Sequence, residues 1–206
     1  MENEQEAKPK KKYFDNISVG NRTKQEIYFA EDHDKNQLCE LFMQKNSDKR
    51  TVIITKSKKK ANELASFFKE KNREVVAVHG NSRKEDLEKI SLQFNTKEIN
   101  ILITTELIFF TLELKDIELI INFELPFEIQ NYFKTLLYVD EIGTAVSFVS
   151  SQEEKMVDLL ELMMKYNIPQ LEIEAFKHTP LPKQTTSKKE KNRKPRHKKK
   201  SKRNKD

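Results

Sequence analysis

Short runs of apolar, largely β-branched residues alternate along this chain with segments whose apolar residues recur at helical spacing. Strands that are apolar throughout are typical of a parallel sheet, because helices cover both of its faces. The sequence therefore predicts an α/β domain with a mostly parallel central sheet flanked by helices on both faces. The expected strands are residues 26–30, 51–55, 75–79, 100–105, 118–123 and 144–149, and the expected helices are residues 35–44, 57–71, 82–94 and 153–166.

Charge divides the chain into a body and a tail. Residues 183–206 hold 13 Lys and Arg residues against two acidic ones, a net charge of +11. The whole chain carries +6, so residues 1–182 carry −5 and the basic balance belongs to the tail alone. We therefore expect a flexible N-terminal segment over residues 1–24, a folded domain over 25–182 and a disordered Lys/Arg-rich tail over 183–206.

Several kinds of chemistry are excluded by what the sequence lacks. Its three glycines, Gly20, Gly80 and Gly143, are too far apart for a glycine-rich phosphate-binding loop. The single cysteine, Cys39, rules out an internal disulfide, and its apolar helical context predicts burial. No apolar run reaches the roughly 18 residues of a membrane helix, and the N-terminus does not resemble a signal peptide. We expect no catalytic residue, no metal, no membrane contact and a cytoplasmic location.

Ligands of parallel sheets usually bind where the strands end. The predicted strands end in residues 55–57, 79–81, 104–106 and 122–126, which read TKS, HGN, TTE and NFELP. These segments are polar and nearly uncharged. They form the candidate binding edge of the predicted sheet.

The chain contains, in this order, the stretches VIITKSKKKANELASFF, VVAVHGN, ILITTELIFFTLELKDIELIINFELP and IPQLEIEAF. Together they resemble the second, C-terminal RecA-like domain of DEAD-box RNA helicases. VIITKSKKKANELASFF, from residue 52, is similar to the family's motif IV, and VVAVHGN followed by Phe94 is similar to its H-G-D…F segment. ILITTELIFFTLELKDIELIINFELP, from residue 101, keeps the register of motif V and the strand that follows it. IPQLEIEAF, from residue 168, resembles the closing segment of bacterial members. The resemblance covers roughly residues 13–182 and implies the RecA-like fold.

The resemblance also locates the family's arginine fingers, and this chain lacks them. No arginine occurs between Arg83 and Arg193. Motif VI, H-R-I-G-R-x-G-R in the family, falls on residues 134–141, KTLLYVDE. An arginine finger is typically worth about 10³–10⁵ in the rate of phosphoryl transfer, and Lys134 is a poor substitute at a bidentate phosphate site. The resemblance thus implies a domain without ATPase or unwinding activity of its own.

Two further elements of the family are altered. FFTLE at residues 109–113 stands where motif V has A-R-G-L-D, so Glu113 takes the place of the aspartate that meets the ATP ribose. The arginine of the Q-x-x-R element is replaced by Leu87. The first RecA-like domain, which carries the P-loop in this family, is not in this sequence. We therefore expect no cofactor, with ATP bound only if a P-loop helicase domain on another chain completes the site.

RNA is the partner that the resemblance implies, bound without sequence preference and mostly through the basic tail. The expected RNA contacts are Thr104, Thr105, Ser57, Lys58 and Gly80 at the sheet edge and Lys198, Lys199, Lys200 and Arg203 in the tail. Each sheet-edge residue also has a purely structural interpretation. The threonines are then β-branched residues at a strand end, residues 57–60 are a solvated helical turn, and Gly80 serves the backbone geometry. His79 is expected to be packed and hydrogen-bonded. The tail is alternatively a solubilising segment or a nuclear signal.

Phe109 and Phe110 are adjacent aromatics where the family is polar, so they form either a repacked core or a partner-binding patch. Three hypotheses follow. The first is a degenerate helicase C-terminal-like domain that binds RNA as an accessory protein. The second is the C-terminal half of a split ATP-dependent helicase. The third is a docking scaffold or regulator of an RNA-processing complex, with the two phenylalanines as anchor.

Overall fold

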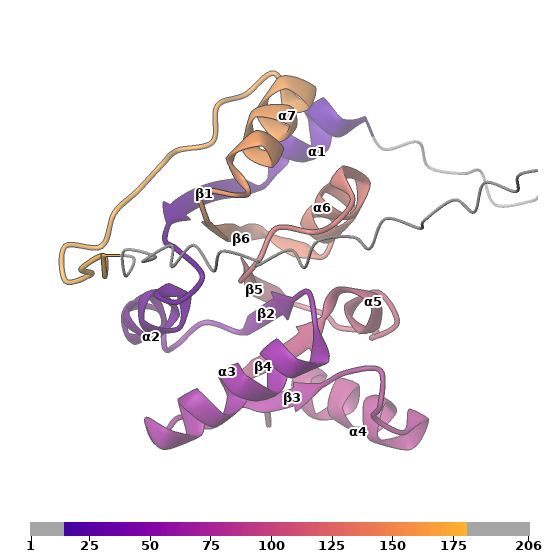
Figure 1. Ribbon diagram of the computed structural model, residues 1–206. Helices are drawn as coiled ribbons and strands as arrows, with labels where there is room; N and C mark the ends of the chain where they lie inside the picture. Colours follow the sequence, from indigo (N-terminus) through magenta and orange to yellow (C-terminus); the bar gives the residue numbers. More distant parts are fainter. Residues whose placement is uncertain (1–14, 181–206) are drawn as a thin grey trace, which may run out of the picture.

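The computed structural model describes residues 15–180, with the backbone alone at Glu141. Six strands form one sheet in the order β1-β6-β5-β2-β4-β3, and each neighbouring pair is parallel (Figure 1). The predicted parallel α/β fold is confirmed. The strands are β1 (Lys24–Phe29), β2 (Thr51–Thr55), β3 (Val76–Val78), β4 (Ile101–Thr105), β5 (Ile117–Asn122) and β6 (Val139–Val149). The helices are α1 (Asn16–Arg22), α2 (Lys35–Lys45), α3 (Lys58–Glu70), α4 (Lys84–Asn95), α5 (Glu106–Phe109), α6 (Ile129–Leu136) and α7 (Glu154–Met164).

Helices cover both faces of the sheet. Successive residues of a strand point to opposite faces, so Ile53 packs on one side while Val52 and Ile54 pack on the other. Helices α2 and α3 cover the first side, and α1, α4, α5, α6 and α7 contribute to the second. Cys39 lies in the first layer with 0% of its surface exposed, so its predicted burial is confirmed. In residues 15–180 no helix is long and apolar enough to cross a bilayer.

The folded domain begins earlier than the expected boundary at residue 24. Residues 16–22 form α1, and the side chain of Asp15 caps its first turn by accepting hydrogen bonds from the N–H groups of Ile17 and Ser18. Helix α1 packs against α7, with Val19 buried. The expectation of a flexible segment is wrong for residues 16–24. A helix of seven residues has about two turns and shows little periodicity in the sequence. Residues 1–14 lie outside the described part.

Two elements near residue 140 also differ from the expectation. Helix α6 was not expected, yet Tyr132, Phe133 and Leu136 form its buried stripe. Strand β6 starts five residues earlier than predicted, with Val139 opposite Ile117, and a bulge precedes its regular ladder. Eight helical residues are too few for a periodic signal, and a bulge breaks strand alternation.

The segment after α7 returns along the edge of the sheet (Figure 1). The N–H of Ile27 donates to the carbonyl of Pro169 at 2.9 Å, and the N–H of Leu171 donates to the carbonyl of Ile27 at 2.8 Å. An uncovered edge strand would present unpaired backbone groups to other chains. These bonds therefore protect β1, the edge strand beside β6.

Gly143 occupies the bulge of β6 in close contact with β5. A Cβ at this position would lie 2.9 Å from the carbonyl oxygen of Glu118 and 2.6 Å from Cγ1 of Val139. Backbone atoms cannot move away as the tip of a long side chain can. Gly80 is different, because a Cβ there would meet nothing within 4 Å and its φ is not positive. The interpretation that Gly80 serves backbone geometry is therefore wrong.

Replacing Gly143 by alanine should lower the free energy of unfolding by about 1–3 kcal/mol, the usual cost of overpacking. Replacing Gly80 by alanine is the matched control and should change it by less than about 0.5 kcal/mol. Urea denaturation of the two variants measures both values. Equal stability of the two variants would show that the bulge tolerates a side chain.

Candidate nucleic-acid interface

The four polar segments that follow the predicted strands meet at one edge of the sheet. All strands are parallel, so β2, β3, β4 and β5 end on the same side. Strand β2 lies between β4 and β5, and β3 lies beyond β4. The structure thus brings together the turn after β2, the turn after β3, the end of β4 and the loop after β5. We refer to this edge as the carboxyl edge.

The turn after β2 presents lysines to solvent at the start of α3. Ser57 caps the helix, because its Oγ accepts a hydrogen bond from the N–H of Lys60 at 3.2 Å. Lys58 is exposed, and the side chain of Lys59 is 85% exposed at 3.7 Å from Glu63. The oxygen of Ser57 thus caps the helix, and its O–H group can still donate a hydrogen bond. Both Ser57 and Lys58 are exposed and accessible to a ligand.

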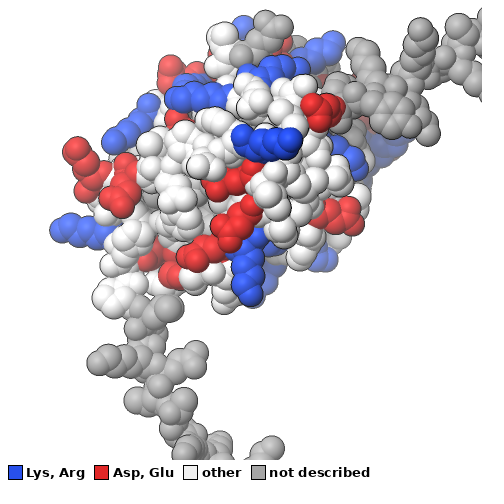
Figure 2. Space-filling model, turned by 90° about the horizontal axis from the view of Figure 1, so that it is seen from above, with Lys and Arg blue, Asp and Glu red and all other residues white. Residues whose placement is uncertain are grey.

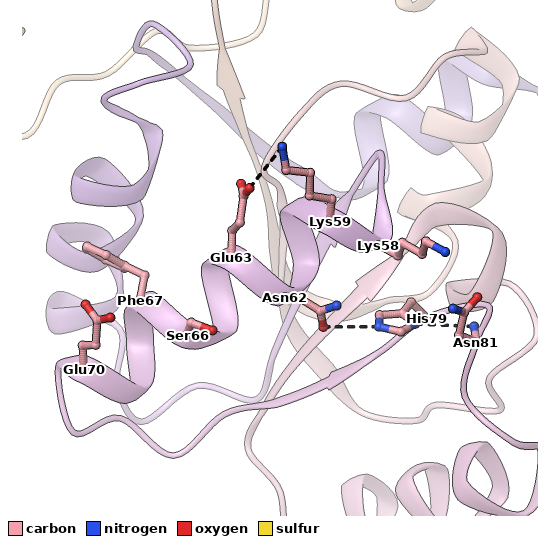
Figure 3. A pocket seen from close by; sticks show the side chains of 9 residues that line it. All are labelled: Lys58, Lys59, Asn62, Glu63, Ser66, Phe67, Glu70, His79 and Asn81. Carbon is pink, nitrogen blue, oxygen red and sulfur yellow. Dashed lines mark hydrogen bonds and ion pairs between the residues drawn. The ribbon is translucent and has the colours of Figure 1, made fainter.

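The turn after β3 is held by hydrogen bonds within residues 79–82 and to α3. The N–H of Ser82 donates to the carbonyl of His79 at 2.8 Å, and Nε2 of His79 lies 3.2 Å from Oδ1 of Asn62 (Figure 3). The N–H of Asn81 lies 3.4 Å from Nδ1 of the same ring. His79 is half-buried and hydrogen-bonded, as the sequence predicted. The turn is consequently fixed beside the first turns of α3.

A cleft of about 650 Å³ runs along α3 from this turn. Figure 3 shows Lys58, His79 and Asn81 at one end of the cleft and Phe67 and Glu70 at the other. The end that carries the lysines belongs to the carboxyl edge. The lining residues are Lys58, Lys59, Asn62, Glu63, Ser66, Phe67, Glu70, His79 and Asn81.

The two threonines at the end of β4 do not share one environment. Thr104 has 0% of its surface exposed, and its Oγ1 lies 3.4 Å from the carbonyl oxygen of Thr105. It is therefore not available to a ligand, and the strand-end interpretation holds for it. Thr105 is half-buried at the last position of β4 and remains a candidate contact.

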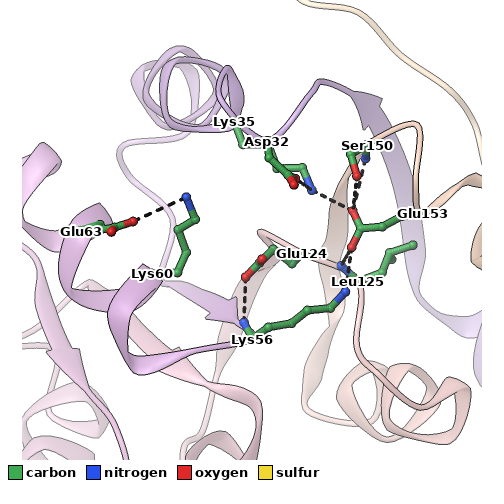
Figure 4. A network of polar contacts seen from close by, with 9 residues as sticks. All are labelled: Asp32, Lys35, Lys56, Lys60, Glu63, Glu124, Leu125, Ser150 and Glu153. Carbon is green, nitrogen blue, oxygen red and sulfur yellow. Dashed lines mark hydrogen bonds and ion pairs between the residues drawn. The ribbon is translucent and has the colours of Figure 1, made fainter. Parts of the chain in front are cut away.

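Glu153 joins the ends of three strands and one helix at the carboxyl edge (Figure 4). Its carboxylate accepts hydrogen bonds from Nζ of Lys35 at 2.8 Å and from Nζ of Lys56 at 3.0 Å. It also accepts hydrogen bonds from the N–H groups of Leu125 at 3.0 Å and Ser150 at 3.2 Å. The side chain of Lys35 is 0% exposed. One carboxylate thus fixes the turn after β2, the loop after β5, the end of β6 and the start of α2.

The charge of Glu153 is maintained by these lysines. Burial raises the pKa of a carboxyl group, but hydrogen bonds and charge from Lys35, and then from Lys56, oppose that effect. The net result is a pKa below the ordinary value of 4.5. The group is therefore ionised at neutral pH, with both lysines as counter-charges.

The chain matches one known protein family. The family model of the helicase conserved C-terminal domain matches residues 34–137, just over half of the chain. The chain belongs to this family.

The proteins that this helicase C-terminal domain resembles include an RNA helicase and DEAD-box proteins. It is 28% identical over 134 residues to the ATP-dependent RNA helicase FAL1 of Meyerozyma guilliermondii, a match covering 64% of this chain and 34% of the relative. The chain therefore spans about a third of the length of that curated relative. The E. coli DEAD-box protein SrmB, solved bound to regulator of ribonuclease activity A, superposes with a TM-score of 0.71 at 17% identity. That match covers 78% of this chain and 97% of the chain in the solved structure.

A second similar structure contains ligands. S. cerevisiae Dbp5 bound to RNA and ADP BeF3 superposes with a TM-score of 0.65 at 17% identity. The match covers 77% of this chain and 42% of Dbp5. Both superpositions support the α/β RecA-like fold of this helicase C-terminal domain, with its parallel sheet and flanking helices.

Glu113 lies on a different surface of the helicase C-terminal domain from the cleft along α3. It is exposed in the loop after α5, where Nδ2 of Asn95 donates to its backbone carbonyl at 2.7 Å. A second cleft of about 650 Å³ lies between this loop and α4. Its charged lining residues are Lys84, Glu88 and Glu113, and Lys84 lies 3.6 Å from Glu88. Two carboxylates against one paired lysine do not suit a triphosphate.

The two adjacent phenylalanines differ in exposure, as the two threonines do. Phe109 has 0% of its surface exposed and packs 4.9 Å from the ring of Tyr138, measured between centroids. Phe110 is half-buried, 6.1 Å from Tyr138, with Nζ of Lys134 at 5.9 Å from its centroid. The partner-binding interpretation is therefore wrong for Phe109, which is core. Phe110 contributes only part of its ring to the surface.

One cation at the carboxyl edge was not predicted as a contact. Arg83 is exposed directly after the 79–82 turn, and in residues 15–180 it makes no ion pair. The other described arginines bond to the protein: Arg22 to the carbonyl of Leu136, Arg50 to those of Phe94 and Asp116, and Arg73 to Glu40. The position of Arg83 directly after the H-G-N-S turn was the sequence signal that could have identified it as a contact. The predicted tail contacts, Lys198, Lys199, Lys200 and Arg203, lie outside the described residues.

Proposed function

We propose that this helicase C-terminal domain binds RNA as an accessory domain and has no ATPase activity of its own. The observation that carries the proposal is the character of the surface where motif VI is expected. In the register of the sequence resemblance, the first two arginines of motif VI correspond to Thr135 and Tyr138. Neither side chain carries the charge that an arginine finger supplies.

The surroundings of these two positions support the same conclusion. Thr135 is 2% exposed, and its hydroxyl donates to the carbonyl of Asn131 inside α6 at 2.8 Å. Tyr138 is half-buried and packs against Phe109. Catalysis of phosphoryl transfer depends on cations that stabilise the transferring phosphoryl group. The one cation in the cluster of Phe109, Phe110 and Tyr138 is Lys134, which lies over the ring of Phe110 and is a poor substitute for an arginine at a bidentate phosphate site.

RNA binding is supported by the surface chemistry of the carboxyl edge and by the composition of the tail. Lys58, Lys59 and Arg83 present cationic side chains at this edge, where ligands of parallel sheets usually bind. The solved Dbp5 complex contains RNA on a protein of the same fold. The +11 charge of residues 183–206 suits phosphate binding without sequence preference. We propose the edge and the tail as two sites on one RNA strand.

The alternatives from the sequence are weaker. A split helicase would still lack the motif VI arginines after a P-loop domain had joined it. The docking hypothesis loses one of its two anchors, because Phe109 is buried in the core. An accessory RNA-binding role needs neither feature.

Purified protein should show no ATP hydrolysis above background, with or without RNA. It should also show no measurable affinity for a fluorescent ATP analogue, because Lys84, the lysine that lines the Glu113 cleft, is paired with Glu88 and two carboxylates line the same cleft. RNA binding by the same preparation, measured by fluorescence anisotropy, is the positive control. ATP hydrolysis that copurifies with the protein through successive columns would refute the proposed lack of ATPase activity. It would not affect the proposal that the protein binds RNA.

A further inference from the structure

Phe127 is the one exposed phenylalanine in residues 15–180. Its surface is 71% exposed, whereas the other phenylalanines of this part are buried or half-buried. It lies in the loop after β5, between the buried residues Leu125 and Pro126 and the start of α6. Burial of a phenylalanine typically stabilises a fold by about 1.5–3 kcal/mol, a gain that this position forgoes. The ring is thus presented at the carboxyl edge from a backbone that is itself anchored.

Lys56 lies against this ring. Its Nζ is 5.1 Å from the ring centroid of Phe127, over the aromatic face. Lys56 is in turn immobilised, because its N–H donates to Oε2 of Glu124 at 2.9 Å and its Nζ donates to Glu153. Figure 4 shows Lys56 extended between these two carboxylates. One face of the ring therefore meets an ammonium group, while most of the ring surface stays open to solvent.

The surroundings of the ring are charged rather than apolar. Lys56, Glu124 and the exposed Glu128 are its neighbours in the fold or the sequence, and Lys58 follows in the turn after β2. A docking site for an apolar protein surface would need a contiguous apolar patch. An open ring between charged groups instead suits a planar, polar partner whose negative charges can pair with the exposed Lys58, because Lys56 is already paired with Glu153. The carboxylate of Glu153 is already neutralised by two lysines.

We propose that Phe127 stacks on an unpaired nucleobase of single-stranded RNA bound at the carboxyl edge. The inference rests on the proposed RNA-binding function and adds to it a contact with a base, beyond the contacts with phosphates. Aromatic side chains stack on every base because each base has a π-face, so the contact carries no sequence preference. The ammonium of Lys56 holds the ring from its other face.

The sequence contains no tryptophan, so Phe127→Trp introduces a single fluorophore at the proposed contact. Its emission should be quenched when an oligouridine of about 12 nucleotides is added. An oligonucleotide of the same length without bases should bind the tail yet leave the emission unchanged. Leu162→Trp, at a position 73% exposed on α7, is the matched control and should not respond to either ligand.

Affinity gives a second readout in the full chain. Phe127→Ala should weaken binding of the oligouridine about 10-fold, by the same factor at low and high salt, because stacking releases no counterions. Phe127→Tyr should retain the wild-type affinity. Stacking is refuted if Phe127→Ala binds RNA as tightly as the wild-type chain and the emission of the introduced tryptophan does not change. The proposed RNA-binding function stands in that case. Quenching of equal size by the oligonucleotide without bases also refutes stacking. Absence of any RNA binding by the wild-type chain refutes both.

Discussion

Replacing Glu153 by glutamine is expected to lower the free energy of unfolding by about 3–5 kcal/mol. The amide keeps the size of the side chain but removes the charge that faces Lys35 and Lys56. Lys35 is fully buried, and its remaining partner, Asp32 at 3.3 Å, is 64% exposed. A buried ammonium without a counter-charge is strongly destabilising, whereas the intact pair is not. Urea unfolding monitored by circular dichroism measures the difference.

An exposed ion pair provides the control. Glu88 lies 3.6 Å from Lys84, and the two side chains are 67% and 86% exposed. Glu88→Gln should change stability by less than about 1 kcal/mol, because exposed pairs contribute little. If Glu153→Gln has as small an effect as Glu88→Gln, the carboxylate does not hold the strand ends together.

The same carboxylate should leave a signature in the pH dependence of stability. Its pKa is lower in the folded chain than the ordinary value of 4.5, so the unfolded chain binds the proton more tightly. The stabilisation is therefore complete above about pH 4.5 and is lost as the pH falls through the lower, folded-state pKa. The free energy of unfolding of Glu153→Gln should depend less on pH between the folded-state pKa and about pH 4.5. Parallel acid titrations of the two proteins compare the slopes.

Removing residues 183–206 is expected to abolish most RNA affinity and most of its salt dependence. Each phosphate neutralised on a single strand contributes about 0.7 to the slope of log affinity against log salt. The tail has 13 Lys and Arg residues. If about half of them engage phosphates, the full chain should show a slope of roughly −4 to −5, and the truncated chain a much smaller one. The body, at −5, has no comparable net attraction for RNA.

A charge reversal at the carboxyl edge separates this site from the tail. Lys58→Glu alters an exposed residue and should leave the fold unchanged. In the full chain it should weaken RNA binding only a few-fold, whereas in the truncated chain it should remove what binding remains. Salt titrations of the four proteins by anisotropy provide the comparison. Full affinity in the truncated chain would assign binding to the edge and make the tail dispensable.

The fold was accessible from the sequence because it depends on patterns that repeat. The predicted strands at residues 51–55 and 100–105 lie within one residue of the observed strands β2 and β4. Helices α3 and α7 have enough turns for an apolar stripe to be visible. Short elements were missed for the converse reason: α1 and α6 have seven and eight residues. Their positions depend on packing partners distant in sequence, such as α7 for α1.

Which candidate residues face a ligand was decided only by the tertiary structure. Thr104 and Thr105 look alike in sequence, as do Phe109 and Phe110, yet in each pair one member is buried by neighbouring elements. The sequence alone determined the parallel α/β architecture, the division of charge between body and tail and the stretch without arginine, because each is a local or compositional property. The Glu153 network and the Lys56–Phe127 contact join residues 97 and 71 positions apart. Such contacts form only when the strands align in their final order, and no local pattern encodes them.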